Sequence, residues 1–118
     1  MNNYKKLKVW NQSIELNLAI YKLYSQLPKS DYFELQNQSK RAAISIASNI
    51  AEGSGRGSEK DFCRFLYISM GSASELECQL LILQKLSNTD VEPIISEIVS
   101  IQKQLHALIK SLSSRFQQ

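Results

Sequence analysis

The sequence predicts an all-α protein, an up-down-up-down bundle of four helices. Apolar residues recur every three to four positions along most of the 118-residue chain, and no stretch alternates apolar and polar residues as a strand does. Three short segments rich in Gly, Pro, Ser, Asn and Asp interrupt this periodicity, at 27–31, 53–58 and 87–90. We therefore expect a single domain over 1–118, with helices at about 7–27, 33–52, 58–86 and 91–114.

The first expected helix, 7–27, carries two apolar stripes when its residues are turned by about 100° per position. One stripe comprises Val9, Leu16, Ile20, Leu23 and Leu27. The other comprises Leu7, Trp10, Ile14, Leu18 and Tyr21. A helix in an isolated four-helix bundle needs only one stripe, so the second indicates a further buried contact, which a subunit interface would supply. The alternative is one broad core face with scattered surface apolar residues, which are common.

The second expected helix, 33–52, has an inward stripe of mostly small residues. The stripe comprises Leu35, Ser39, Ala42, Ala43, Ile46 and Ile50. Small side chains let a neighbouring helix approach closely, so we expect this helix to be central in the bundle.

The third expected helix, 58–86, starts at Ser58, whose hydroxyl can accept a hydrogen bond from the backbone N–H of Asp61. Its core stripe comprises Phe62, Phe65, Leu66, Ser69, Ala73, Leu76, Leu80 and Leu83. Gly71 lies in the middle of this helix, where glycine costs about 1 kcal/mol relative to alanine. A close helix crossing at Gly71 would explain that cost.

The fourth expected helix, 91–114, tolerates Pro93 because the proline falls in its first turn. Apolar residues follow a seven-residue pattern typical of left-handed helix packing. They are Val91, Ile94, Ile98, Ile101, Leu105, Leu108 and Leu112.

Residues that could support catalysis or hold a cofactor are scarce. His106 is the single histidine, and no Cys/His cluster accompanies it. Cys63 and Cys78 fall about 22 Å apart along one helix, too far for a disulfide. The glycine-rich segment 53–58 lacks the Gly-Lys-Ser/Thr of a phosphate-binding loop. We therefore expect no enzyme, no metal ion, no cofactor and, without an apolar stretch of about 20 residues, no membrane span. A cytoplasmic location is the default expectation.

Basic residues are more informative, although the formal charge is only +3. The candidate nucleic-acid-binding residues are Lys40, Arg41, Arg56, Lys60 and Arg64. Lysines also mark the N-terminus (Lys5, Lys6, Lys8), and only basic charges follow Glu97 (Lys103, Lys110, Arg115). Such patches attract phosphates without sequence specificity. The alternative is a solvated face balanced by Glu52, Glu59 and Asp61.

The central segment 38–57, QSKRAAISIASNIAEGSGRG, resembles the 23S rRNA intervening-sequence protein family. The resemblance covers about residues 4 to 90 and continues through Phe62, Arg64-Phe65-Leu66, Ile68, Gly71-Ser72 and Glu75-Leu76-Glu77. Two positions depart from the family's usual QLRRAA stretch: Ser39 stands in place of Leu, and Lys40 in place of Arg. Lys40 keeps the charge but loses the bidentate geometry of a guanidinium toward phosphate.

The resemblance implies a four-helix fold and a homopentameric, barrel-like ring. It also implies genes that lie, in some bacteria, inside 23S rRNA intervening sequences. A similar protein accompanies the reverse transcriptase of diversity-generating retroelements, where it binds the enzyme and nucleic acid through a basic surface. The first hypothesis is therefore a non-enzymatic, oligomeric accessory protein that contacts RNA or DNA phosphates. The second is a protein-binding adaptor or structural oligomer, such as a reverse-transcriptase accessory subunit.

Overall fold

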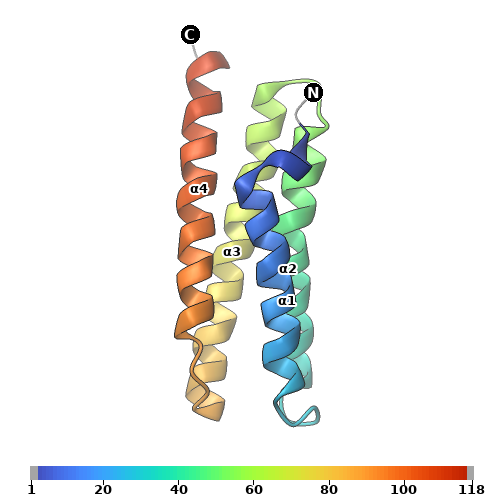
Figure 1. Cartoon of the computed structure of the whole chain (residues 1–118), viewed down its shortest axis with the longest axis vertical. Helices are drawn as coiled ribbons and strands as arrows, with labels where there is room; N and C mark the ends of the chain where they lie inside the picture. The colour runs from blue at the N-terminus through green and yellow to red at the C-terminus, as the bar shows by residue number, and fades with distance from the viewer. Residues whose placement is uncertain (1–2, 117–118) are drawn as a thin grey trace.

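The computed structural model describes residues 3–116, which form four long helices and no strand (Figure 1). The helices are α1 (Lys8–Ser25), α2 (Phe33–Ser54), α3 (Glu59–Ser87) and α4 (Glu92–Phe116), preceded by a short 3-10 helix, η1 (Tyr4–Lys6). The predicted all-α class is confirmed. The helix ends differ from the expected ones by two residues at most, and the sequence did not predict η1.

Neighbouring helices are antiparallel, and each one packs against two others. Helix α1 lies against α2 and α4, and α3 lies against the same two helices from the other side. The bundle measures 50 × 20 × 19 Å. Because the chain runs down, up, down and up, the start of α1, the end of α4 and the loop between α2 and α3 all lie at one end (Figure 1). No helix in the described part of the chain is long and apolar enough to cross a membrane.

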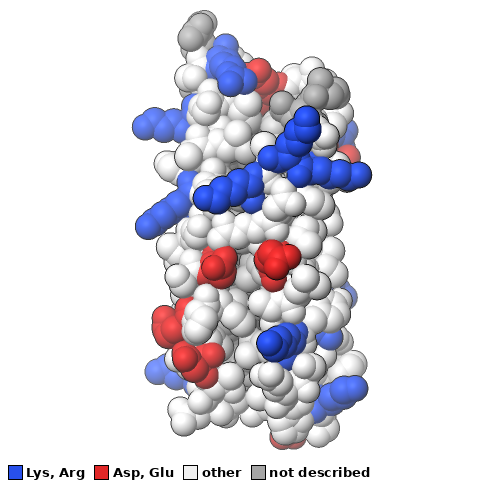
Figure 2. Space-filling view, in the orientation of Figure 1, with Lys and Arg blue, Asp and Glu red and all other residues white. Residues whose placement is uncertain are grey.

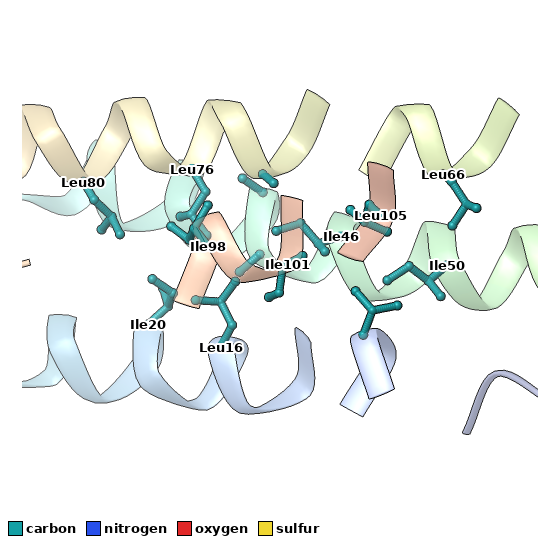
Figure 3. Packing of buried hydrophobic residues seen from close by; sticks show 14 of the residues in the cluster. Leu16, Ile20, Ile46, Ile50, Leu66, Leu76, Leu80, Ile98, Ile101 and Leu105 are labelled. Carbon is teal, nitrogen blue, oxygen red and sulfur yellow. The ribbon is translucent and has the colours of Figure 1, made fainter. Parts of the chain in front are cut away.

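The hydrophobic core runs along the axis of the bundle and receives residues from all four helices (Figure 3). Every residue of the stripe expected on α3 is buried. On α4, Ile98, Ile101, Leu105 and Leu112 are buried as expected, and Ile109 joins them. Ile94 and Leu108, also expected in this stripe, are half-buried. Helix periodicity therefore identified the inward faces correctly.

The two stripes of α1 have different surroundings. Val9, Leu16, Ile20 and Leu23 are buried in the core. In the other stripe, Trp10 and Ile14 are half-buried, whereas Leu18 is 61% exposed and Tyr21 47% exposed. The chain itself therefore partly covers the N-terminal portion of this stripe and leaves Leu18 and Tyr21 exposed.

The structure corrects the position expected for Gly53 and the helix crossing expected at Gly71. Gly53, expected in the loop, lies inside α2, and a Cβ atom there would stand 2.7 Å from the Cβ of Phe65 and 2.9 Å from the Cδ1 of Phe62. Helix α2 continues to Ser54 because Gly53 lets α3 pack directly against it. Gly71, expected at a close helix crossing, is exposed, with no atom within 4 Å of where its Cβ would be. No crossing within the described chain explains Gly71.

Helix α3 has well-defined ends. The Ser58 hydroxyl accepts a hydrogen bond from the Asp61 backbone N–H at 3.1 Å, which confirms the expected N-cap. At the other end, Asn88 adopts a left-handed conformation (φ 59°), and its N–H donates to the Gln84 carbonyl at 2.9 Å. Asparagine tolerates this conformation better than most residues. The helix therefore stops there, and the chain turns toward α4.

One buried polar contact joins α1 to α2. The hydroxyl groups of Tyr24 and Ser39 share a hydrogen bond of 2.8 Å, and both residues are buried. Burial raises the pKa of the Tyr24 phenol above its ordinary value, and the hydrogen bond to Ser39 opposes this shift. A buried hydroxyl that loses its partner typically costs about 1–3 kcal/mol.

We expect Tyr24→Phe and Ser39→Ala each to lower the free energy of unfolding, because each leaves a buried hydroxyl alone. The double variant should lose less than the sum of the two, since it removes both hydroxyls, with a coupling of about 0.5–1.5 kcal/mol. Urea unfolding of the four proteins measures this cycle. Strictly additive losses would mean that the two hydroxyls do not stabilise each other.

Candidate nucleic-acid interface

The five basic residues predicted to bind nucleic acid do not form one surface. Arg56, Lys60 and Arg64 lie at the end of the bundle where the α2–α3 loop leads into α3. Lys40 and Arg41 lie in α2, and at 1.5 Å per residue Arg41 is about 20 Å from the end of that helix. The structure therefore separates them into two groups.

Arg56 and Arg64 both lie close to the ring of Phe65. Their guanidinium carbons lie 4.7 Å and 4.6 Å from the ring centroid of Phe65, which itself packs against Gly53. Asp61 joins both: its Oδ1 lies 2.9 Å from Arg64 Nε, and its Oδ2 lies 3.9 Å from Arg56 Nε. Arg56 also pairs with Glu52 at 2.8 Å. Two of the predicted phosphate-binding residues are thus already engaged with acidic neighbours.

Lys40 and Arg41 face different surroundings because consecutive helix residues point about 100° apart. The Lys40 ammonium lies 4.2 Å from the ring centroid of Tyr21 on α1. Arg41 lines a hollow of about 380 Å³ between α2 and α3, together with Ser45, Ser72 and Glu75. Each cation lies beside a different neighbouring helix, so the pair does not present one binding face.

The basic charge is concentrated at one end of the bundle. The hydrogen bond between Ser72 and Ser45, 2.8 Å long, marks a level near the middle. We define the terminal half as residues 3–14, 46–71 and 98–116, and the opposite half as residues 15–45 and 72–97. The terminal half contains nine basic and three acidic side chains, a formal charge of +6. The opposite half contains five basic and eight acidic side chains, a formal charge of −3.

Figure 2 shows this asymmetry on one face of the molecule. Lysine and arginine side chains are concentrated over the upper part of the view, where α1 begins and α4 ends. Acidic side chains occupy mainly the middle and lower parts. The excess positive charge comes largely from Lys5, Lys6 and Lys8 and from Lys103, Lys110 and Arg115, which the antiparallel topology brings to the same end. The predicted set of five omitted these residues.

Comparison with known proteins places this geometry in a family. The sequence model described as "23S rRNA-intervening sequence protein" matches residues 5–107. The chain belongs to this family. A solved structure from Bacteroides thetaiotaomicron, described as a protein of unknown function from the S23 ribosomal protein family, superimposes with a TM-score of 0.78. The two sequences are 30% identical over 86% of this chain and 98% of that one. No curated protein matches the sequence.

The neighbouring residues Ser39 and Lys40 of this family member have different surroundings. Ser39 is fully buried and hydrogen-bonded to the Tyr24 hydroxyl. Lys40 lies over the Tyr21 ring.

Residues with catalytic potential in this family member lie apart from one another. His106 is exposed on α4, and Cys63 and Cys78 are free thiols in α3, the first buried and the second exposed. Among residues 3–116, no three His, Cys, Asp or Glu side chains gather as a metal-binding group would require. Cys63 Sγ lies 3.8 Å from the Ile109 carbonyl oxygen, so the thiol packs against α4.

Proposed function

We propose that this chain is a non-enzymatic, oligomeric accessory protein that binds the phosphate backbone of RNA or DNA through its terminal half. The observation that supports this function is the separation of charge, +6 in the terminal half against −3 in the opposite half. A localised positive field attracts phosphates far more strongly than the modest net charge would. Contacts made mainly to the backbone carry little sequence preference.

The lysines of the terminal half are better phosphate ligands than the arginines predicted first. Five of these lysines are exposed and make no ion pair in the described part of the chain: Lys5, Lys6, Lys8, Lys103 and Lys110. Arg56 and Arg64 share Asp61, and Arg115 pairs with Glu59 at 3.2 Å. Phosphate would have to compete with these carboxylates for the arginines, whereas the lysines can bind phosphate without breaking an ion pair.

Self-association would strengthen the same function. We propose that the second stripe of α1, with Leu18 and Tyr21 exposed, contributes to contacts between copies of the chain in a ring, with five copies as the expected number. A hollow of about 280 Å³ continues this surface between α1 and α2, lined by Trp10, Ile14 and Ile44 among others. A ring would repeat the basic end around an axis, and several weak phosphate contacts would then add to a useful affinity.

The same apolar surface favours a second candidate function, a protein-binding adaptor or structural oligomer. Exposed apolar side chains on neighbouring helices are typical of protein–protein contacts. In this alternative the partner is another protein, such as a reverse transcriptase for which the chain acts as an accessory subunit. Nucleic acid would then have no effect on the assembly.

The absolute mass in solution, measured by light scattering with and without a structured RNA, separates these candidates. Our proposal expects a mass of about five chains that increases with RNA and returns to its first value in high salt. A five-chain mass that ignores RNA would favour the adaptor. A single-chain mass would contradict the proposed ring.

We further expect the triple variant Lys5→Ala, Lys6→Ala, Lys8→Ala to weaken RNA binding and to flatten its salt dependence. Each neutralised phosphate contributes about 0.7–0.9 to the slope of log affinity against log salt, so the slope should fall by up to about 2–3. The matched control is Lys22→Ala, Lys29→Ala, Lys85→Ala, which removes the same charge from the opposite half. Equal losses in the two variants would argue against a localised interface.

A further inference from the structure

An open hollow lies beside the proposed phosphate-binding surface, between the start of α3 and the end of α4. Its volume is about 610 Å³, within the range of small-molecule binding sites. Tyr67 from α3 and Phe116 from α4 contribute aromatic rings to its lining, and Cys63 lies among them. Lys60, Asp61 and Arg64 add charged groups. Aromatic and cationic side chains therefore share one hollow in the positive half of the molecule.

Both aromatic residues of the hollow are exposed. Tyr67 is 61% exposed and Phe116 is 37% exposed. They come from different helices and line the same hollow. Exposed aromatic rings beside a cationic groove are the usual means by which proteins hold the bases of single-stranded nucleic acids.

The charged residues of the hollow differ in their availability. Asp61 and Arg64 neutralise each other through their 2.9 Å contact, and the Arg64 guanidinium also lies over Phe65. Lys60 is exposed and makes no ion pair among residues 3–116. The hollow therefore offers one free cation next to its aromatic lining, a combination that suits a base with an adjoining phosphate better than an apolar side chain of a protein.

We propose that this hollow binds an unpaired base of a single-stranded nucleic acid, with the base stacked against Tyr67 and the adjoining phosphate near Lys60. The proposal rests on the proposed phosphate binding and adds a preference to it. A base in a duplex is already stacked and paired, so it cannot enter the hollow without losing those contacts. The protein should therefore bind single strands more tightly than duplexes of equal phosphate number.

Three labelled probes test the proposal by fluorescence anisotropy at one salt concentration: a twenty-four-nucleotide oligouridylate, a strand of the same length with abasic sugars, and a twelve-base-pair duplex, which has about the same number of phosphates. We expect Tyr67→Ala to weaken binding of the oligouridylate about tenfold, and to leave the abasic strand unchanged. Tyr67→Phe, which keeps the ring, should retain most of the affinity. Phe33→Ala is the matched control, because Phe33 is also 61% exposed but lies in the opposite half.

The outcomes separate the stacking site from the phosphate interface. Equal affinity of the unmodified protein for the oligouridylate and the abasic strand would overturn the stacking site and leave phosphate binding intact. Equal losses from Tyr67→Ala and Phe33→Ala would also overturn it. Failure of every probe to bind would overturn both the stacking site and the proposed function.

Discussion

Replacing Leu76 by alanine is expected to lower the free energy of unfolding by about 2–5 kcal/mol. Leu76 lies near the middle of α3, is fully buried and belongs to the core to which all four helices contribute (Figure 3). Truncation removes apolar contacts and leaves a cavity that long, rigid helices fill poorly. Because small domains are stable by only about 5–15 kcal/mol, this loss is a large fraction of the total.

Leu81→Ala is the matched control for Leu76→Ala. It removes the same atoms from the same helix, but Leu81 is 44% exposed, so the change should cost much less. Urea unfolding, monitored by circular dichroism, measures the stability of both variants. An unchanged slope of unfolding free energy against urea concentration would show that cooperativity is preserved. Equal losses at the two positions would contradict the core assignment of α3.

The second large effect concerns the two glycines inside helices, for which we expect opposite signs. Gly53→Ala should lower the free energy of unfolding by about 1–3 kcal/mol, because the new methyl group would collide with Phe62 and Phe65 of the facing helix. Gly71→Ala should raise it by up to about 1 kcal/mol, because nothing lies near the new methyl group and alanine favours the helix.

Thermal unfolding at one protein concentration compares these variants with the unmodified protein. Stabilisation by Gly53→Ala would contradict the close approach of α2 and α3. The mass of the Gly71→Ala variant in solution tests separately whether this position affects assembly of the chain. A variant chain that assembles less well while its helices become more stable would indicate that Gly71 is needed at a contact between copies.

The helices and their inward faces were predictable because both follow from local pattern. The stripe on α3 needed only its own sequence, and Ser58 needed only a partner three residues away. Gly53 was harder to predict, since glycine followed by serine and another glycine is typical of a loop. Only the aromatic side chains of the facing helix explain why α2 continues through it. The role of Ser39 likewise depends on Tyr24, fifteen residues away on another helix.

The candidate site was less predictable than the fold because surface electrostatics depend on the assembled bundle. Grouping cations by their closeness in sequence joined Lys40 to Arg41, although the helix turns them toward different neighbours. It also missed that Lys8 and Lys110, more than one hundred residues apart, belong to the same end. The ion pairs that Arg56 and Arg64 form in the structure depend on the position of the Asp61 side chain, which reaches both guanidinium groups.

The order of the helices around the bundle also affects how the chain acquires its structure. Among the four α-helices of the described chain, three of the four lateral contacts join helices consecutive in sequence, and the fourth, between α1 and α4, connects distant segments. Local contacts cost little loop entropy, so chains of this topology fold in microseconds to milliseconds. We therefore expect the closure of α4 onto α1 to be the costly step, and α2 with α3, in close contact at Gly53, to form the folding nucleus.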